Sequence, residues 1–190
     1  MNIFLPYENS VVKSVEALDD VRLQKQLVET YQLLTLALKE QSEGKEIKAG
    51  HYHHPVYLFY KDNIPFLAYY GYICCCEYLH RFYKRHTLLE YFQDRCSELL
   101  DINCYVNSVE GIFVPSKFTP YYLEGSIKDP NHIRTTENVS ALFQKKLINK
   151  WNNDKAKGRE PKWTNRLIPQ FYQNHSLLLL RVSVVTVSSA

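Results

Sequence analysis

The 190-residue sequence predicts a single, mainly α-helical domain. Apolar residues recur at helical spacing, most clearly in the row Leu23, Leu27, Tyr31, Leu34 and Leu38. Prolines and glycines are few, and 45% of the residues are hydrophobic, which suffices for one packed core. We therefore expect a multi-helix bundle over residues 1–175.

The first elements are predicted from capping residues. Residues 1–7 should be extended, and a short helix should follow with Ser10 or Ser14 as its N-cap. A long helix should begin near Asp19 or Asp20, because Asp is a good N-cap and the apolar row starts just beyond it.

Prolines and polar stretches divide the middle of the chain. The stretch 41–50 is polar and contains two glycines, so we expect a loop. Pro55 fits the first turn of a helix, and Pro65 should force a fresh start before a helix over 66–84. A further helix is predicted over 88–100.

The last third of the chain contains one strong helix. Residues 101–125 should be irregular, and as a loop they could lie near a functional site. Thr135 or Thr136 should cap a helix that runs to about Asn153. The tail 176–190 is rich in β-branched residues, and its last residues, VTVSSA, resemble the end of an immunoglobulin variable domain. We expect this tail to be a fusion remnant.

Composition bounds the setting of the protein. The net charge is only +3, and neither a signal peptide in MNIFLPYENS nor a run long enough to span a bilayer is present in the sequence. The three consecutive cysteines Cys74, Cys75 and Cys76 should be reduced and mostly buried. Reduced cysteines are typical of a cytoplasmic protein, and for a viral protein this would be the cytoplasm of the host. Tyr78 and Tyr83 are expected in the core.

Polar side chains form a row on the expected long helix. In the stretch 18–32, LDDVRLQKQLVETYQ, the residues Arg22, Gln26 and Glu29 are four and three positions apart and so lie on one side of two turns. Such a row is a solvated face, a buried network that orients helices, or part of a site.

Two later blocks carry further polar and aromatic residues. Block 54–86 opens with His54 and Pro55 before an aromatic-rich helix, and then contains Cys76, Glu77, Tyr78, Arg81 and His86. Glu77 and Arg81 are at i and i+4 and should form an ion pair. Block 149–163 contains Asn-Lys-Trp and then Arg-Glu-Pro-Lys-Trp.

Taken in order, the three blocks resemble the pyrimidine-dimer DNA glycosylase family, the phage endonuclease V-type repair enzymes and their viral and bacterial relatives. The resemblance covers most of residues 1–170. It implies a mainly α protein that excises a damaged or modified pyrimidine from double-stranded DNA, with AP lyase activity as a further step. In that family the glutamate at the position of Glu29 is catalytic.

The resemblance also implies an amine nucleophile, the α-amino group of the chain. Such an amine has an ordinary pKa of about 7.7–8.0, so a useful fraction is neutral at pH 7. Here it would belong to Met1, or to Asn2 after trimming. No cofactor and no metal are expected, because the cluster His51, His53 and His54 lacks a partner at a typical ligand spacing.

Four residues are expected to bind the substrate: Arg22, Gln26, Gln32 and His54. Arg22 would either hold a phosphate through its two-pronged guanidinium or join Gln26 and Glu29 in a network within the helix. His54 would either face a phosphate at a helix N-terminus or be structural.

A basic segment should face the DNA backbone. Between residues 145 and 166 the chain has eight cations and two acidic residues. The residues expected to contact DNA are Lys155, Lys157, Arg159, Lys162 and Trp163. The alternative is a solvated helix and loop.

Two other functions remain open at this point. The first is a non-catalytic member of the same fold that binds a nucleotide or modified nucleic acid, as in viral counter-defence. The second is a helical protein-interaction domain with an exposed apolar patch.

Overall fold

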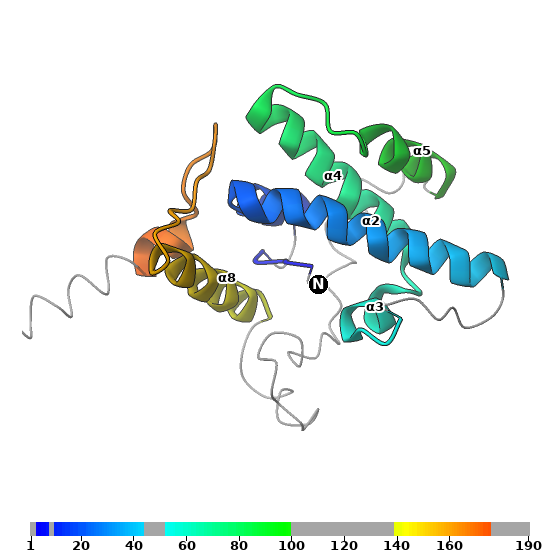
Figure 1. Ribbon diagram of the computed structural model, residues 1–190, viewed down its shortest axis with the longest axis horizontal. Coiled ribbons are helices and arrows are strands. Elements are labelled where there is room, and N and C mark those ends of the chain that lie inside the picture. Colours follow the sequence, from blue (N-terminus) through cyan, green and yellow to red (C-terminus); the bar gives the residue numbers. More distant parts are fainter. Residues whose placement is uncertain (1–2, 8–9, 44–51, 100–138, 176–190) are drawn as a thin grey trace, which may run out of the picture.

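The computed structural model describes residues 3–7, 10–43, 52–99 and 139–175 (Figure 1). Its helices include α1 (Val11–Glu16), α2 (Asp20–Glu43), α3 (Pro55–Tyr60), α4 (Ile64–Phe82), α5 (Leu89–Leu99) and α8 (Val139–Lys155). Residues 170–175 are also helical, and no strand occurs in the described ranges. The predicted mainly α fold is therefore confirmed.

The start of the chain is extended and is joined to α1 by serine side chains. Ser10 is the N-cap of α1, since its hydroxyl accepts a hydrogen bond from the Lys13 amide at 3.2 Å. Ser14 has a different role: its buried hydroxyl donates to the Tyr7 carbonyl and accepts from the Tyr7 amide, both at 3.1 Å. This pair of bonds holds the extended segment against α1.

The predicted boundaries of the middle helices are correct to within a few residues. α2 starts at Asp20 as expected but continues to Glu43, three residues into the predicted loop. Pro55 lies in the first turn of α3, and Pro65 lies in the first turn of α4, so α4 begins at Ile64 and not after the proline. The predicted elements at 101–125 and at Thr135 and Thr136, and the tail 176–190, lie outside the described residues.

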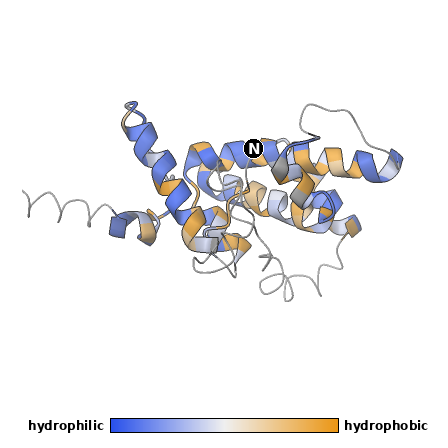
Figure 2. Cartoon of the chain, turned by 90° about the horizontal axis from the view of Figure 1, so that it is seen from below, coloured by the Kyte–Doolittle hydropathy of each residue, from blue (hydrophilic) through white to orange (hydrophobic). Residues whose placement is uncertain are grey.

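The core forms where α2 crosses α4. Hydrophobic and hydrophilic residues occupy different sides of the helices (Figure 2), and the side chains of Leu23, Leu27 and Leu34 are fully buried. α4 also packs against α1 and α5. Tyr78 is partly buried against this core, but Tyr83 is 82% exposed, so its predicted core position is wrong. Tyr83 follows the last turn of α4 with a positive φ of 51°, which turns the residue away from the helix.

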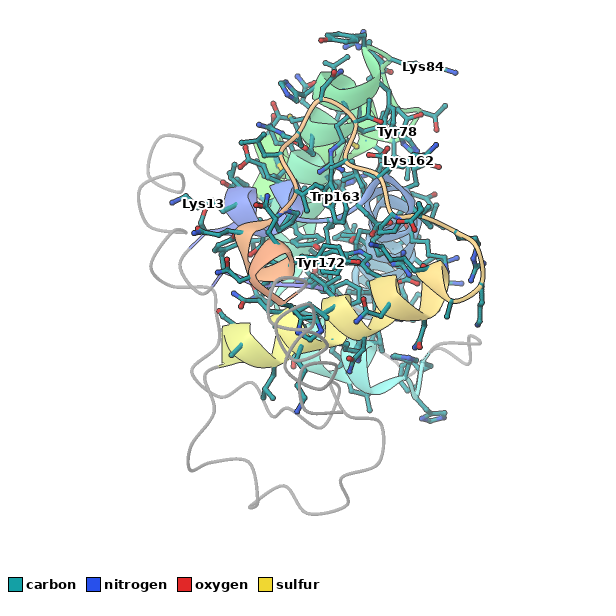
Figure 3. All side chains as sticks on the ribbon, turned by 90° about the vertical axis from the view of Figure 1, so that its left-hand side faces the viewer. Lys13, Tyr78, Lys84, Lys162, Trp163 and Tyr172 are labelled. Carbon is teal, nitrogen blue, oxygen red and sulfur yellow. The ribbon has the colours of Figure 1, made fainter. Side chains whose placement is uncertain are left out.

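A second part of the core consists of aromatic rings from the C-terminal region. Trp151 of α8 contacts Trp163, Phe171 and Tyr172, with ring centroids 4.8–5.8 Å apart. Figure 3 shows Trp163 and Tyr172 among packed side chains, whereas Lys13 and Lys84 extend from the outside of the molecule. These contacts fasten the chain after α8 to the rest of the domain.

The three consecutive cysteines behave as core residues. Cys74 and Cys75 are buried, Cys76 is partly buried, and all three are free thiols. Burial raises the pKa of the Cys75 thiol to about 12, which keeps it protonated. Within the described ranges, no helix has the length and apolarity needed to cross a bilayer.

Gly71 allows the close approach of α4 and α5. A methyl group on its Cα would overlap the Phe92 ring of α5. We expect Gly71→Ala to lower the free energy of unfolding by about 1–3 kcal/mol, since overpacking outweighs the gain in helix propensity. Urea denaturation would measure this loss. Gly71→Ala should cost less in a Phe92→Leu background than in the wild-type background, and equal costs in the two backgrounds would contradict the clash.

Candidate active site

The start of the described chain is buried beside the middle of α2. Ile3 and Phe4 are almost fully buried, and the Phe4 amide donates a hydrogen bond to Gln26 Oε1 at 3.3 Å. The Tyr70 hydroxyl lies 2.9 Å from the same oxygen and 3.2 Å from the Phe4 carbonyl oxygen. Gln26 and Tyr70 therefore hold the N-terminal segment against α2 and α4.

Gln26 also connects this segment to Glu29. Its Nε2 donates a hydrogen bond to Glu29 Oε2 at 3.3 Å, and Glu29 is half-buried on α2. Burial strongly raises the pKa of Tyr70, and the nearby Glu29 carboxylate adds to this increase. The structure thus brings Gln26 and Glu29 together, as the helical spacing predicted, and adds Phe4 and Tyr70 to them.

Arg22 has partners other than Glu29. Its guanidinium forms ion pairs with Asp19 at 3.1 Å and with Asp154 of α8. Burial disfavours the charge, but Asp19 and Asp154 outweigh this effect and raise the pKa of Arg22. The predicted network within the helix therefore includes Gln26 and Glu29, while Arg22 joins α2 to α8.

The other two predicted substrate-binding residues lie apart from this network. Gln32 is exposed, one turn beyond Glu29. His54 is the N-cap of α3, and its Nδ1 accepts a hydrogen bond from the Val56 amide at 3.2 Å. This bond favours the structural alternative for His54.

The predicted DNA-backbone segment lies beside the start of α2. The Asp20 amide donates to the Lys162 carbonyl at 2.8 Å, and the Thr164 hydroxyl donates to the Asp20 carboxylate at 2.7 Å. The side chains of Lys155, Lys157, Arg159 and Lys162 are exposed. Arg159 also pairs with Asp154 at 2.6 Å, so the basic segment and Arg22 share one carboxylate.

Trp163 differs from the other members of this predicted set. Its side chain is 8% exposed, its ring packs against Trp151, and its indole N–H donates to the Ala17 carbonyl at 3.0 Å. A buried ring with a satisfied N–H is not placed to contact a phosphate or to stack on a base. This expectation is corrected: Trp163 positions the basic segment from within the core.

A buried ion cluster lies beside the start of α2 and consists of Glu77 and Arg81 of α4 together with Arg166. The predicted Glu77–Arg81 pair is present, with Nε 2.6 Å from the carboxylate. Arg81 also donates to the Leu18 carbonyl at 2.7 Å and to the Glu16 carbonyl at 2.9 Å, and Arg166 pairs with Glu77 at 2.7 Å. The contribution of Arg166 could not be predicted, because 89 residues separate it from Glu77.

Two half-buried lysines of α8 were not predicted as site residues. Burial and the neighbouring Lys150 cation lower the pKa of Lys146 to about 8. The pKa of Lys150 is also lowered, first by burial and then by Arg22 and Lys25, while Glu29 acts in the opposite direction. Their i and i+4 spacing on a basic helix was the only indication in the sequence.

A cavity of about 650 Å³ lies between α1 and residues 166–173. Tyr7, Lys13, Glu16 and Arg166 contribute to its lining, and Glu29 does not. In the ranges that the structure describes, no group of three or more His, Cys, Asp or Glu side chains could hold a metal ion.

The described residues form a mainly helical fold in which the Glu29 carboxylate is linked through Gln26 to the buried start of the described chain. Comparison with protein families is more specific, because residues 1–91 match the family described as pyrimidine dimer DNA glycosylase. This match confirms the family resemblance, and it contains Glu29 and the blocks at 18–32 and 54–86. The third block, 149–163, lies outside it. No curated protein and no solved structure matches the chain.

Proposed function

We propose that the protein is a DNA glycosylase that excises a damaged or modified pyrimidine through an N-terminal amine and Glu29. The family match points to pyrimidine dimers as the class of lesion. The observation that carries the proposal is the hydrogen-bonded path from the Phe4 amide through Gln26 to Glu29. Three residues span at most about 11 Å, which is the largest separation that the chain allows between the amine of residue 1 and the Phe4 amide.

The proposed roles follow from the chemistry of the step. The neutral amine of Met1, or of Asn2 after trimming, attacks C1′ of the damaged nucleotide, and the base leaves and takes up a proton. The C1′–O4′ bond then opens, which gives a protonated imine. Glu29 then takes a proton from C2′, and the C3′–O bond breaks as the phosphate departs, which is the AP lyase step. Gln26 holds the Glu29 carboxylate in position through its 3.3 Å hydrogen bond.

Arg22 and the exposed cations would bind the duplex. Arg22 already bridges α2 and α8 through Asp19 and Asp154, so in this proposal it orients the basic segment and contacts a phosphate only if Asp154 exchanges partners. Lys155, Lys157, Arg159 and Lys162 would contact phosphates directly. Gln32, exposed one turn beyond Glu29, would meet the strand that carries the lesion.

Ultraviolet-irradiated plasmid DNA tests the proposal. Full-length protein with a free N-terminus should nick irradiated supercoiled plasmid and leave unirradiated plasmid intact. Binding of irradiated DNA without nicking or base release would favour the non-catalytic alternative. Absence of both binding and nicking would contradict any action on this lesion.

The basic segment should make binding depend on salt. Replacement of Lys155, Lys157 and Arg159 by glutamine should weaken DNA binding to a similar extent for all sequences. Each lost phosphate contact should make the negative slope of log K against log salt concentration shallower by about 0.9. Fluorescence anisotropy over a range of salt concentrations measures this slope. Lys84→Gln, an exposed lysine beyond α4, is the control, and overlapping curves for the triple variant and wild type would show a merely solvated face.

A further inference from the structure

Lys146, Lys150 and Asp154 form a row along one side of α8, with one helical turn between successive members. Asp154, at one end of the row, forms an ion pair with Arg22 of α2. Arg22, Lys25 and Glu29 of α2 all affect the pKa of Lys150, so the row followed back from Asp154 passes this side of α2 at Lys150. Lys150, in the middle, is close enough to Glu29 for the carboxylate to affect its pKa.

The same part of α8 contacts the N-terminal segment. The Phe143 ring lies 6.3 Å from the Phe4 ring, and Gln144 Nε2 donates to the Pro6 carbonyl at 2.8 Å. Lys146 therefore lies on α8 between the level of Lys150 and the level at which the helix meets the start of the chain. Phe4 is also the residue that Gln26 links towards Glu29.

The surroundings of one of these lysines favour its neutral form. Half-burial and the Lys150 cation lower the pKa of Lys146 to about 8. Roughly a tenth of this amine is neutral at pH 7, about 200 times the neutral fraction of a lysine at the ordinary pKa of about 10.4. A lysine beside another cation is a known route to an amine nucleophile.

We propose that Lys146 is a second catalytic amine of this site, which forms an imine with the aldehyde of an abasic deoxyribose in DNA. This inference rests on the proposed function, since the glycosylase step generates the abasic sugar. It assigns a nucleophile within the chain that does not depend on how the first residue is processed.

The step is balanced without any oxidant or reductant. The neutral Nζ attacks C1′ of the open-chain sugar, and the N–C1′ bond forms. The carbonyl oxygen takes one proton from the amine and one from solvent, and it leaves as water. The product is a protonated imine, from which Glu29 could start β-elimination as in the proposed function.

Borohydride trapping on duplex DNA with one abasic site tests the inference, because borohydride reduces the imine to a stable amine link. We use full-length protein with an N-terminal extension, which moves the free α-amine away from residue 1, and we map the cross-linked peptide by mass spectrometry. The cross-link should persist in this protein and should map to Lys146. In the same background, Lys146→Arg keeps the charge and should reduce trapping at least tenfold, whereas Lys145→Arg, at the exposed neighbouring position, should leave it unchanged.

The pH dependence provides a second readout. Trapping at Lys146 should increase with pH and level off above about 8. Lys150→Met removes the neighbouring cation and should shift this midpoint upwards. The other charged groups that affect the pKa of Lys150 remain in this variant, so the shift reports the loss of the Lys150 cation alone. These groups are Arg22, Lys25, Glu29 and Asp154.

Several outcomes would overturn the inference. Trapping that persists in Lys146→Arg would mean that the residue only supplies charge. A cross-link confined to the N-terminal residue of the unextended protein, and lost in the extended protein, would refute the inference but leave the proposed function standing. No cross-link in either protein would refute both the inference and the AP lyase step.

Discussion

Glu29→Gln should abolish base excision and strand cleavage, with a loss of about 10²- to 10⁴-fold in rate. The amide has the volume of the carboxylate, and its oxygen still accepts the hydrogen bond from Gln26. What is lost is the group that accepts and returns protons in the proposed function. Nicking of irradiated plasmid measures the rate, and affinity for irradiated DNA should change little.

Glu43→Gln is the matched control for this prediction. Glu43 lies at the other end of α2, is exposed, and forms a surface ion pair with Lys39 at 3.7 Å. The nicking activity and the thermal unfolding temperature of the Glu43→Gln variant should equal those of wild type. If Glu29→Gln unfolds while wild type is inactive, Glu29 belongs to a structural network and not to an active site.

Arg81→Met should cause the largest loss of stability, about 3–5 kcal/mol in the free energy of unfolding. The Arg81 side chain is fully buried, and its donors satisfy the Glu77 carboxylate and the carbonyls of Leu18 and Glu16. Methionine fills much of the space but leaves these acceptors without that donor. Urea denaturation measures the change. Arg85→Met, at an exposed position just beyond α4, should cost less than about 0.5 kcal/mol.

The effect of Arg81→Met should also depend on pH. Burial alone would raise the pKa of Glu77, but the hydrogen bonds from Arg166 and Arg81 outweigh it, so the pKa of Glu77 is lowered in the folded state. A lowered carboxyl pKa stabilises the fold above the unfolded value of about 4.5 and loses this contribution as the pH falls. The stability difference between wild type and Arg81→Met should therefore narrow in acid. A difference that stays constant down to pH 2 would show that Glu77 and Arg81 are not coupled.

Local chemistry made much of the fold predictable from the sequence. Ser10 caps α1, the apolar row of α2 is buried, and α5 lies within one residue of its predicted ends at both sides. The spacing of Gln26 and Glu29 and of Glu77 and Arg81 placed each pair within reach, because residues three or four apart on a helix are neighbours. These features depend only on residues close together in the chain.

The tertiary structure alone decided which distant residues meet. Arg22 turned to Asp154, 132 residues away, and Trp163 turned into the core, 146 residues from its partner Ala17. Neither partner is encoded in helical spacing, because both contacts depend on how α8 and the chain after it pack against the first two helices. The lowered pKa of Lys146 has the same origin, since burial and the field of neighbouring charges exist only in the folded chain. The sequence by itself determined the helices and the polar row on α2, and packing determined which chemistry surrounds that row.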